Sequence, residues 1–561
     1  MRQRLRVQRR SFSPYPWLLL SLLLLGAFLR FYTIGVKTIW LDEAFSIWLS
    51  HHTLLDLWGW LIKIDQHPPL YYTLLHFWQQ LFGDLQGAVR ALSALCSTLA
   101  IPCFYAAGRR LFDRAVALVA TLLLVTAPFH VRYAQETRMY ALLTLAVAMA
   151  LYLLARLLFE PVERQPRWLW PAFGVTQAAV MWTHNTAAIF FPLALNLAIG
   201  GAVFWQHGQG GVSSLPALNW PDFERRWLRT QLLALICWLP WSVPFLIQSL
   251  GVVREFWIPF PNAGIVYETL HNFHLAHQPE SPVPWLLGDL LYWGLGIIGI
   301  WSLRRRGALL ALLFMLFSLP IGGEWLVSLR RPIFSDRTLI WVTLPYYLLV
   351  AAGVIQLERW GSGIVTGPVR RYRGQLVAGC SLLALLTLNG QALANYYSHF
   401  AKEGWDEAAA YVADQAEPND LLLFHATWVQ LPFDYYFRHT AAGDDATIVR
   451  HGVPVDLFDR GILEPKMAGT DIPQMQQIVA GHDRVWLIYS HDWYTDPQGI
   501  LPRALGRQRQ LVAQRQFRGV RVLLYQPQLV LESILKIGCG YADYTYTSDC
   551  HREFQDRHLV E

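Results

Sequence analysis

The sequence predicts an all-α membrane protein with about eleven transmembrane helices (range about 10 to 13), interfacial helices and a soluble C-terminal α/β domain. The 561-residue chain is 54% hydrophobic, with 25 Trp and only 15% charged residues, which departs from a soluble composition. Apolar segments of about 20 residues, enough to cross a hydrocarbon core roughly 30 Å thick, recur along residues 1–395. Residues 396–561 are more polar and mix helical with strand patterns. We therefore expect two domains, 1–395 in the membrane and 396–561 outside it.

Each predicted span is an apolar run of roughly membrane-crossing length. The eleven runs cover about residues 16–35, 86–107, 115–131, 138–158, 168–184, 186–206, 231–250, 284–303, 307–327, 338–357 and 376–395. The first run follows five Arg within ten residues, as a signal peptide would. It is long enough to span, and no small-residue cleavage pattern precedes Lys37, so we interpret it as a transmembrane helix.

The charge distribution predicts the orientation of the chain. Residues 1–395 carry 31 Lys/Arg against 18 Asp/Glu, a net charge of +13, whereas residues 396–561 carry 15 against 22, a net charge of −7. With the N-terminus in the cytoplasm, 21 of the 31 basic residues lie on the cytoplasmic side, in agreement with the positive-inside rule. An odd number of spans then puts the C-terminal domain on the periplasmic or extracellular side of a bacterial plasma membrane.

The first long connection, residues 36–85, is too apolar for an ordinary loop. Residues 42–63 carry apolar side chains at roughly helical spacing opposite polar ones, which predicts an interfacial helix in the outer headgroup layer. Residues 70–82 would cover only about 20 Å as a helix, too little to cross the membrane. They predict a second surface helix, which begins at Pro68 and Pro69.

The C-terminal residues contain patterns of both helix and strand. We expect a helix over 405–415, strands over 420–425 and 484–490, and a hairpin made of 511–517 and 520–525. This mixture predicts an α/β or α+β domain of about 150 residues. Cys539 and Cys550 are candidates for a disulfide, which an exported domain permits.

Four polar clusters fall at the outer edge of the predicted spans. They are Asp42 with Glu43; residues 65–72, which include Asp65, His67 and Tyr71; residues 132–140, which include Arg132, Glu136 and Arg138; and Arg330 and Arg331 with Asp336 and Arg337. Acids at a bilayer edge cost solvation energy unless they are paired or used. The outward ends of spans are normally poor in Lys and Arg, so the presence of arginines there also indicates a function.

Carboxylates beside arginines at this level suit transfer chemistry on a lipid-linked anionic substrate. A carboxylate can take a proton from an acceptor hydroxyl, while guanidinium groups bind a phosphate and stabilise the charge that grows on it as it leaves. The sequence contains no P-loop, CxxC or HExxH motif. We expect neither a nucleotide cofactor nor a nucleic-acid partner.

Three of these clusters together resemble the protein O-mannosyltransferase-like glycosyltransferases, which include the bacterial transferases that add aminoarabinose to lipid A. The matching segments are the acidic pair after the first span, Asp-x-His-Pro-Pro-Leu-Tyr-Tyr at 65–72, and Arg-Tyr-Ala-Gln-Glu-Thr-Arg-Met-Tyr at 132–140. The resemblance covers about residues 15–395. It implies the GT-C fold, a polyprenyl-phosphate sugar as donor, and inverting transfer at the periplasmic face.

The resemblance also implies roles for individual residues. Asp42 matches the acidic position proposed as general base, Glu43 is its neighbour, and Asp65 and His67 match the motif that contributes to the substrate cavity. His67 stands where the aminoarabinose branch has Lys, which aligns the chain with the mannosyltransferase-like branch. In all, we expect Asp42 and Glu43 to be catalytic, Arg138, Arg337, Arg331 and Arg132 to bind the donor phosphate, and Asp65, His67, Tyr71, Glu136 and Trp257 to line the cavity.

Structural interpretations of the same residues stay open. Asp42 and Glu43 would also stabilise the N-terminus of a surface helix. Glu136, between two arginines, would also form a structural ion pair. Arg331 and Arg337 would also anchor a span by extending to the interface.

The predicted function is transfer of a sugar from a polyprenyl-phosphate donor to the hydroxyl of a glycan, lipid (lipopolysaccharide included) or protein. No cofactor is required by this chemistry, and a divalent metal is left open. A flippase of lipid-linked sugars is the main alternative, although it predicts repeated halves and charges deep in several spans, and the spans are nearly free of charge apart from edge positions such as Glu324. A catalytically inactive assembly partner is the second alternative.

Overall fold

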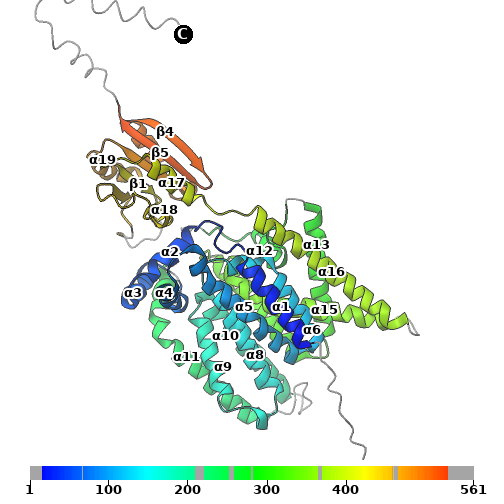
Figure 1. Cartoon of the computed structure of the whole chain (residues 1–561). Coiled ribbons are helices and arrows are strands. Elements are labelled where there is room, and N and C mark those ends of the chain that lie inside the picture. Colours follow the sequence, from blue (N-terminus) through cyan, green and yellow to red (C-terminus); the bar gives the residue numbers. More distant parts are fainter. Residues whose placement is uncertain are drawn as a thin grey trace, which may run out of the picture.

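The computed structural model describes residues 15–65, 67–208, 220–251, 258–279, 282–363, 369–457, 459 and 465–528. Figure 1 shows a bundle of long helices with a small α/β domain at one end, next to helix α2. This mostly helical architecture with one mixed domain agrees with the predicted fold class. The division of the chain at residue 395 stays a prediction.

The bundle is built from apolar helices that overlap every predicted span. They are α1 (Tyr15–Phe31), α5 (Gln86–Leu111), α6 (Arg114–Thr126), α7 (Pro128–Ala134), α8 (Tyr140–Phe159), α9 (Leu169–Met181), α10 (Asn185–Gly208), α11 (Trp220–Gly251), α13 (Pro282–Ser302), α14 (Gly307–Ser328), α15 (Thr343–Gly363) and α16 (Val369–Ser398). Within the described residues, eight helices are long and apolar enough to cross a membrane, or nine if the bent pair α6–α7 is one span. The count of eleven is therefore not confirmed, since α1 has 17 residues and α9 only 13.

Local sequence explains where these helices start and bend. The side chain of Asp113 accepts a hydrogen bond from Val116 N and caps α6. Pro128 lies in the first turn of α7, where a backbone N–H would have no partner within the helix, so the missing N–H of proline costs nothing. The chain bends by 56° at the break before Pro128, and the turn after α7 lies against α2, where Thr137 N donates to Glu43.

The first connection forms three short helices, not two. The expected helix over 42–63 is wrong as a single element, because the chain breaks into α2 (Leu41–Ser50) and α3 (Leu54–Ile64). Thr53 begins the second helix, since its hydroxyl accepts a hydrogen bond from Asp56 N. Helix α4 (Leu70–Phe82) coincides with the expected surface helix. In later connections lie η1 (Val162–Arg164), α12 (Ala263–Leu275) and η2 (Asp336–Val342).

The C-terminal domain is a five-stranded sheet with helices. Its elements are α17 (Trp405–Gln415), β1 (Leu421–His425), η3 (Thr427–Val429), α18 (Gln430–Phe437), β2 (Val449–Gly452), η4 (Gly469–Asp471), α19 (Ile472–Val479), β3 (Val485–Tyr489), α20 (Asp492–Thr495), α21 (Ile500–Gly506), β4 (Arg509–Phe517) and β5 (Val520–Pro527). The strand order is β2-β1-β3-β5-β4, with β2, β1 and β3 parallel and β5 antiparallel to both β3 and β4. Every residue of β1 and β3 is buried, as expected for central parallel strands.

The C-terminal domain rests on the first connection of the bundle. Tyr436 in α18 accepts a hydrogen bond from Ile39 N at 2.7 Å, and its neighbour Tyr435 donates to the Asp84 carbonyl at 2.8 Å. Arg438 pairs with the Asp84 carboxylate. Leu41, at the start of α2, is buried in the core of the C-terminal domain. The residues around Asp42 are therefore held by both parts of the chain.

Helices α13 and α15 cross at a distance that only glycine permits. A Cβ on Gly299 would lie 1.9 Å from the Leu349 carbonyl oxygen, whereas a Cβ on Gly294 in the same helix would meet nothing within 4 Å. We expect Gly299→Ala to force the helices apart and destabilise the protein by about 1–3 kcal/mol. Gly294→Ala is the matched control and should unfold like the native protein. Monodispersity after heating in detergent measures both, and equal stability of the two variants would contradict this packing.

Candidate active site

A cavity of about 450 Å³ lies where the C-terminal domain meets the bundle. Its wall combines residues of the first connection, of the turns before α8 and α10, of the α14–α15 connection, and of the loops after β1 and β3. The acidic, basic and histidine residues that line it are Asp42, Asp65, His67, Arg138, His184, Arg331, Arg337 and His491. Six of the residues predicted for the site thus lie around one cavity, although they come from four segments of the chain.

Asp42 is the carboxylate that faces this cavity beside two arginines. Its Oδ2 accepts a hydrogen bond from Arg337 Nη1 at 2.7 Å and lies 4.0 Å from Arg138 Nε. Burial raises the pKa of Asp42, but the positive charges of Arg138 and Arg337 outweigh it and leave the pKa below its usual value of 3.8. Asp42 is therefore ionised at neutral pH and has an exposed edge, with 25% of its side chain accessible.

Arg138 is held by a network of polar side chains at the cavity wall. Its Nη1 donates to the Tyr72 hydroxyl at 3.1 Å, and that hydroxyl donates to Asp65 Oδ2 at 3.0 Å. Asp65 Oδ1 lies 2.8 Å from His67 Nδ1, which fixes the orientation of the ring. Arg138 Nε makes no hydrogen bond. The network thus keeps the guanidinium at the cavity with one buried N–H group still to be satisfied.

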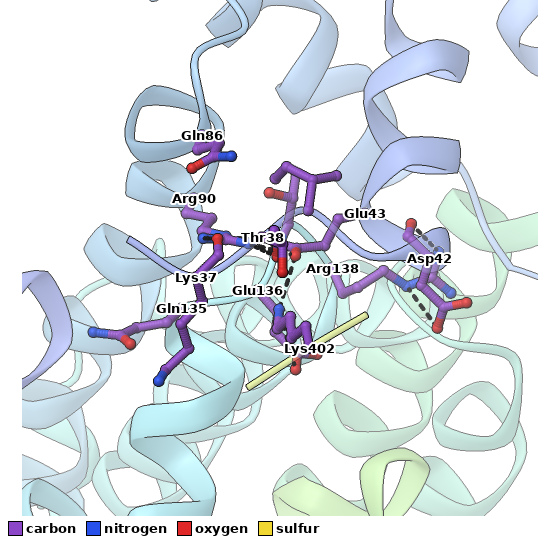
Figure 2. Close-up of polar contacts among 12 residues, drawn as sticks. Lys37, Thr38, Asp42, Glu43, Gln86, Arg90, Gln135, Glu136, Arg138 and Lys402 are labelled. Carbon is purple, nitrogen blue, oxygen red and sulfur yellow. Dashed lines mark hydrogen bonds and ion pairs between the residues drawn. The ribbon is translucent and has the colours of Figure 1, made fainter. Parts of the chain in front are cut away.

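Glu43 points away from the cavity into a buried ion cluster. Figure 2 shows Arg138 directed toward Asp42, whereas Arg90 and Lys402 gather around Glu43. Arg90 binds both carboxylate oxygens at 2.8 and 2.7 Å, Lys402 Nζ lies 2.8 Å from Oε2, and Thr137 N donates to Oε1 at 2.9 Å. Burial raises the pKa of Glu43, but the two cations outweigh it and lower the pKa to about 2. The geometry favours a structural role for Glu43 over the predicted catalytic one.

Three other predicted residues lie behind the cavity wall. Arg132 pairs with Glu136 at 3.3 Å, and Lys402 lies 3.6 Å from Glu136, so Glu136 adjoins the ion cluster around Glu43. Tyr71 is fully buried, and its hydroxyl is 2.9 Å from Ser93 Oγ. None of these residues lines the cavity. Trp257, Cys539 and Cys550 lie outside the described residues.

Several residues of the site were not expected from the sequence. His184 lines the cavity with its ring 5.3 Å from that of His67, and its Nε2 has no hydrogen-bond partner. Arg90 lies inside a predicted span, where an unpaired charge is costly. Its position in the sequence could therefore have indicated that it pairs with a buried carboxylate. Trp428, Trp493 and Tyr494 come from the C-terminal domain, whose sequence carried no motif.

The residues of the site leave the question of a metal open. Within the ranges that the structure describes, no group of three or more His, Cys, Asp or Glu side chains is arranged to hold a metal ion. Asp42 and His67 line the cavity, whereas Glu43 faces the other way, so these three side chains do not converge on one ion.

Comparisons with known proteins agree with this fold. Residues 66–212 match the family model described as dolichyl-phosphate-mannose-protein mannosyltransferase. ArnT from Cupriavidus metallidurans, in a crystal structure with undecaprenyl phosphate bound, is similar over 92% of this chain and 98% of its own, with 15% identity and a TM-score of 0.57. An oligosaccharyltransferase from Archaeoglobus fulgidus, tethered to an acceptor peptide, is similar over 90% of this chain and 74% of its own, with 11% identity and a TM-score of 0.52. No curated protein matches the chain.

The fold and the family match show which proteins this chain is similar to. The bundle with its surface helices and appended domain has the GT-C fold of these glycosyltransferase structures. The family model covers residues 66–212, and over the rest of the chain the similarity is one of fold.

The buried ion cluster predicts a stability effect that separates the two adjacent carboxylates. Glu43→Gln removes the charge that pairs Arg90 and Lys402, so we expect a loss of about 3–5 kcal/mol, because cations are left buried without a partner. Asp42→Asn is the matched control, since its side chain borders the cavity, and should unfold near the native temperature. Thermal unfolding in detergent measures both variants.

The same cluster sets the acid limit of stability. The pKa of Glu43 falls from 4.5 in an unfolded chain to about 2, so its stabilisation is fully present above pH 4.5 and is lost as the pH falls toward 2. A Glu43→Gln protein as stable as the native one at neutral pH would contradict the structural role.

Proposed function

We propose that this protein transfers a sugar from a polyprenyl-phosphate donor to an acceptor hydroxyl at the outer face of a bacterial plasma membrane, with inversion at the anomeric carbon. The observation that carries the proposal is the pairing of the Asp42 carboxylate with Arg337 and Arg138 at the wall of one cavity. It supplies a base and two phosphate-binding groups within reach of the same ligand. ArnT, the similar structure, binds undecaprenyl phosphate, which supports a donor of that class.

The arginines suit the donor phosphate. Guanidinium groups bind phosphate oxygens bidentately and stay charged at any physiological pH. Arg331 and Arg337 reach the cavity from the α14–α15 connection, and Arg138 from the turn before α8. A phosphate between them gains negative charge as the sugar leaves, and fixed positive charge stabilises this change.

Asp42 performs the proton transfer. Its carboxylate takes the proton of the acceptor hydroxyl while the hydroxyl oxygen forms a bond to the anomeric carbon. The bond from that carbon to the phosphate oxygen breaks, and its electron pair leaves with the polyprenyl phosphate. Attack opposite the leaving group inverts the anomeric centre.

Donor binding would also increase the basicity of Asp42. The pKa of Asp42 is held down by the charges of Arg138 and Arg337. A phosphate that takes over these guanidinium groups neutralises part of their charge, so the pKa of the carboxylate rises toward its usual value. The base is thus strengthened when a donor is present.

The outer-face location rests on charge and on the position of the site. The cavity lies at the bundle end that carries the C-terminal domain, which the positive-inside rule assigns to the periplasmic or extracellular side. The acceptor is a glycan, lipid or protein that presents a hydroxyl at that surface.

The base assignment predicts a selective loss of turnover. Asp42→Asn keeps the shape of the side chain but cannot accept the proton, so we expect transfer to fall by a factor of about 100 to 10,000. Sugar transfer from a labelled polyprenyl-phosphate hexose to the envelope fraction of the source cells measures it in vesicles. Donor binding should persist in this variant, and transfer at the native rate would exclude Asp42 as the base.

The phosphate assignment predicts weaker donor binding. Arg337→Gln removes a charged group that would donate hydrogen bonds to the phosphate, so we expect the KM for the polyprenyl-phosphate sugar to rise about ten- to a hundredfold. Arg330 is the matched control, because it belongs to the same connection but is exposed and does not line the cavity. Arg330→Gln should keep the native KM, and an unchanged KM in Arg337→Gln would contradict the assignment.

A further inference from the structure

The C-terminal domain turns its ligand-binding edge toward the cavity. Strands β1 and β3 are adjacent and parallel, and the chain leaves β1 for β2 on one side but leaves β3 for β4 and β5 on the other. Such a change of direction opens a crevice beyond the carboxyl ends of the two strands, where open α/β sheets bind ligands. The segments that follow β1 and β3 both line the cavity that contains Asp42.

These two segments carry aromatic side chains into the cavity. Trp428 follows β1, and His491, Trp493 and Tyr494 follow β3. Trp493 is 63% exposed and lines the cavity, so its ring is accessible to a ligand there. Trp428 is 91% buried, yet its indole N–H has no hydrogen-bond partner. Trp40, on the bundle side of the cavity, also has an unpartnered indole N–H.

The loop after β3 is held in place by the rest of its domain. His491 Nε2 lies 3.4 Å from Glu403 Oε1, and Asp492 pairs with Arg521. Asp496, just beyond the aromatic pair, accepts hydrogen bonds from the Tyr489 hydroxyl and from the backbone of α21. The aromatic surface is therefore preorganised, which lowers the entropy lost when a ligand binds.

The chemistry of this surface differs from that of the opposite wall. Arg138, Arg331 and Arg337 all come from the bundle, whereas the C-terminal domain adds indole faces, a phenol and an imidazole. Sugar rings present C–H faces that pack on aromatic rings and hydroxyls that accept from indole N–H groups. A buried N–H with no partner loses about 1–3 kcal/mol until such an acceptor arrives.

We infer that the segments after β1 and β3 form an acceptor subsite for a carbohydrate, with Trp493 stacked on a sugar ring and Trp428 donating to a sugar hydroxyl. This inference rests on the proposed transferase function and names its acceptor class as a glycan. The hydroxyl to be glycosylated then points from the aromatic surface toward Asp42.

Saturation-transfer NMR on the full-length protein in lipid nanodiscs tests the subsite without turnover. The probes are the methyl glycosides of mannose, glucose and N-acetylglucosamine, and a threonine-containing peptide serves as the competing acceptor class. We expect saturation of at least one glycoside and a loss of about tenfold in Trp493→Ala, with partial recovery in Trp493→Phe. Trp168→Ala is the matched control, because Trp168 is 54% exposed and lies on the connection between α8 and α9, at the other end of α8.

Two results would overturn the subsite itself, and a third would assign it to another acceptor class. One is the absence of saturation for every glycoside in the native protein, and the other is a glycoside signal that survives Trp493→Ala unchanged. Peptide saturation that depends on Trp493 would instead assign the surface to a protein acceptor and would also reject the inference.

Kinetics separate this inference from the proposed function. In the vesicle assay, Trp493→Ala should raise the acceptor KM about tenfold while the donor KM stays native, which is the opposite split from Arg337→Gln. Trp493-dependent glycoside binding without any transfer would reject the transferase function and keep the carbohydrate site. Transfer without Trp493-dependent glycoside binding would reject the carbohydrate site and keep the transferase function.

Discussion

The ion cluster around Glu43 is the interaction on which the arrangement of the site depends. Its carboxylate receives Arg90 from α5, Lys402 from the connection that leads into the C-terminal domain, and Thr137 N from the turn that carries Arg138. Arg90 also donates to the carbonyls of residues 34, 37 and 38, so it shapes the chain just before α2. One buried carboxylate thus fixes the relative positions of the first connection, the bundle and the appended domain.

The ion cluster around Glu43 determines the direction in which the Asp42 side chain points. Successive residues on an α-helix point about 100° apart, so the direction of one side chain sets those of its neighbours. Leu41 is fixed in the core of the C-terminal domain and Glu43 in the ion cluster. Asp42, between them, has the remaining direction, which leads to Arg337 and the cavity. The two adjacent acids therefore have different surroundings, since Glu43 holds the helix and Asp42 faces the cavity.

The sequence predicted elements whose cause is local and missed contacts whose cause is distant. The length of the apolar runs predicted the helices of the bundle, and the prolines before residue 70 predicted α4. The apolar stripe over 42–63 predicted one helix, but the cap at Thr53 divides it into α2 and α3. Strand β2 was not predicted, because its four residues, Val449–Gly452, are too few and too polar to form a strand pattern. Motif position singled out Asp42, which lines the cavity, yet the partners of Glu43 lie 47 and 359 residues away, and no pattern indicates such a distance. The aromatic surface was missed for the same reason, since only the sheet topology brings Trp428 and Trp493 together.

Magnitudes explain why the two carboxylates cannot exchange roles. The pair of Asp42 and Arg337 is partly exposed, with 25% and 15% of the side chains accessible, and a pair of this kind is worth about 1 kcal/mol. An anionic ligand can replace it at small cost. The Glu43 cluster has 0 to 4% accessible side chains, and breaking a buried pair costs about 3–5 kcal/mol. A phosphate that entered there would have to unfold the junction between the domains first. The exposed pair is the one that ligand binding can open, and it adjoins the cavity where both the bundle arginines and the aromatic surface meet.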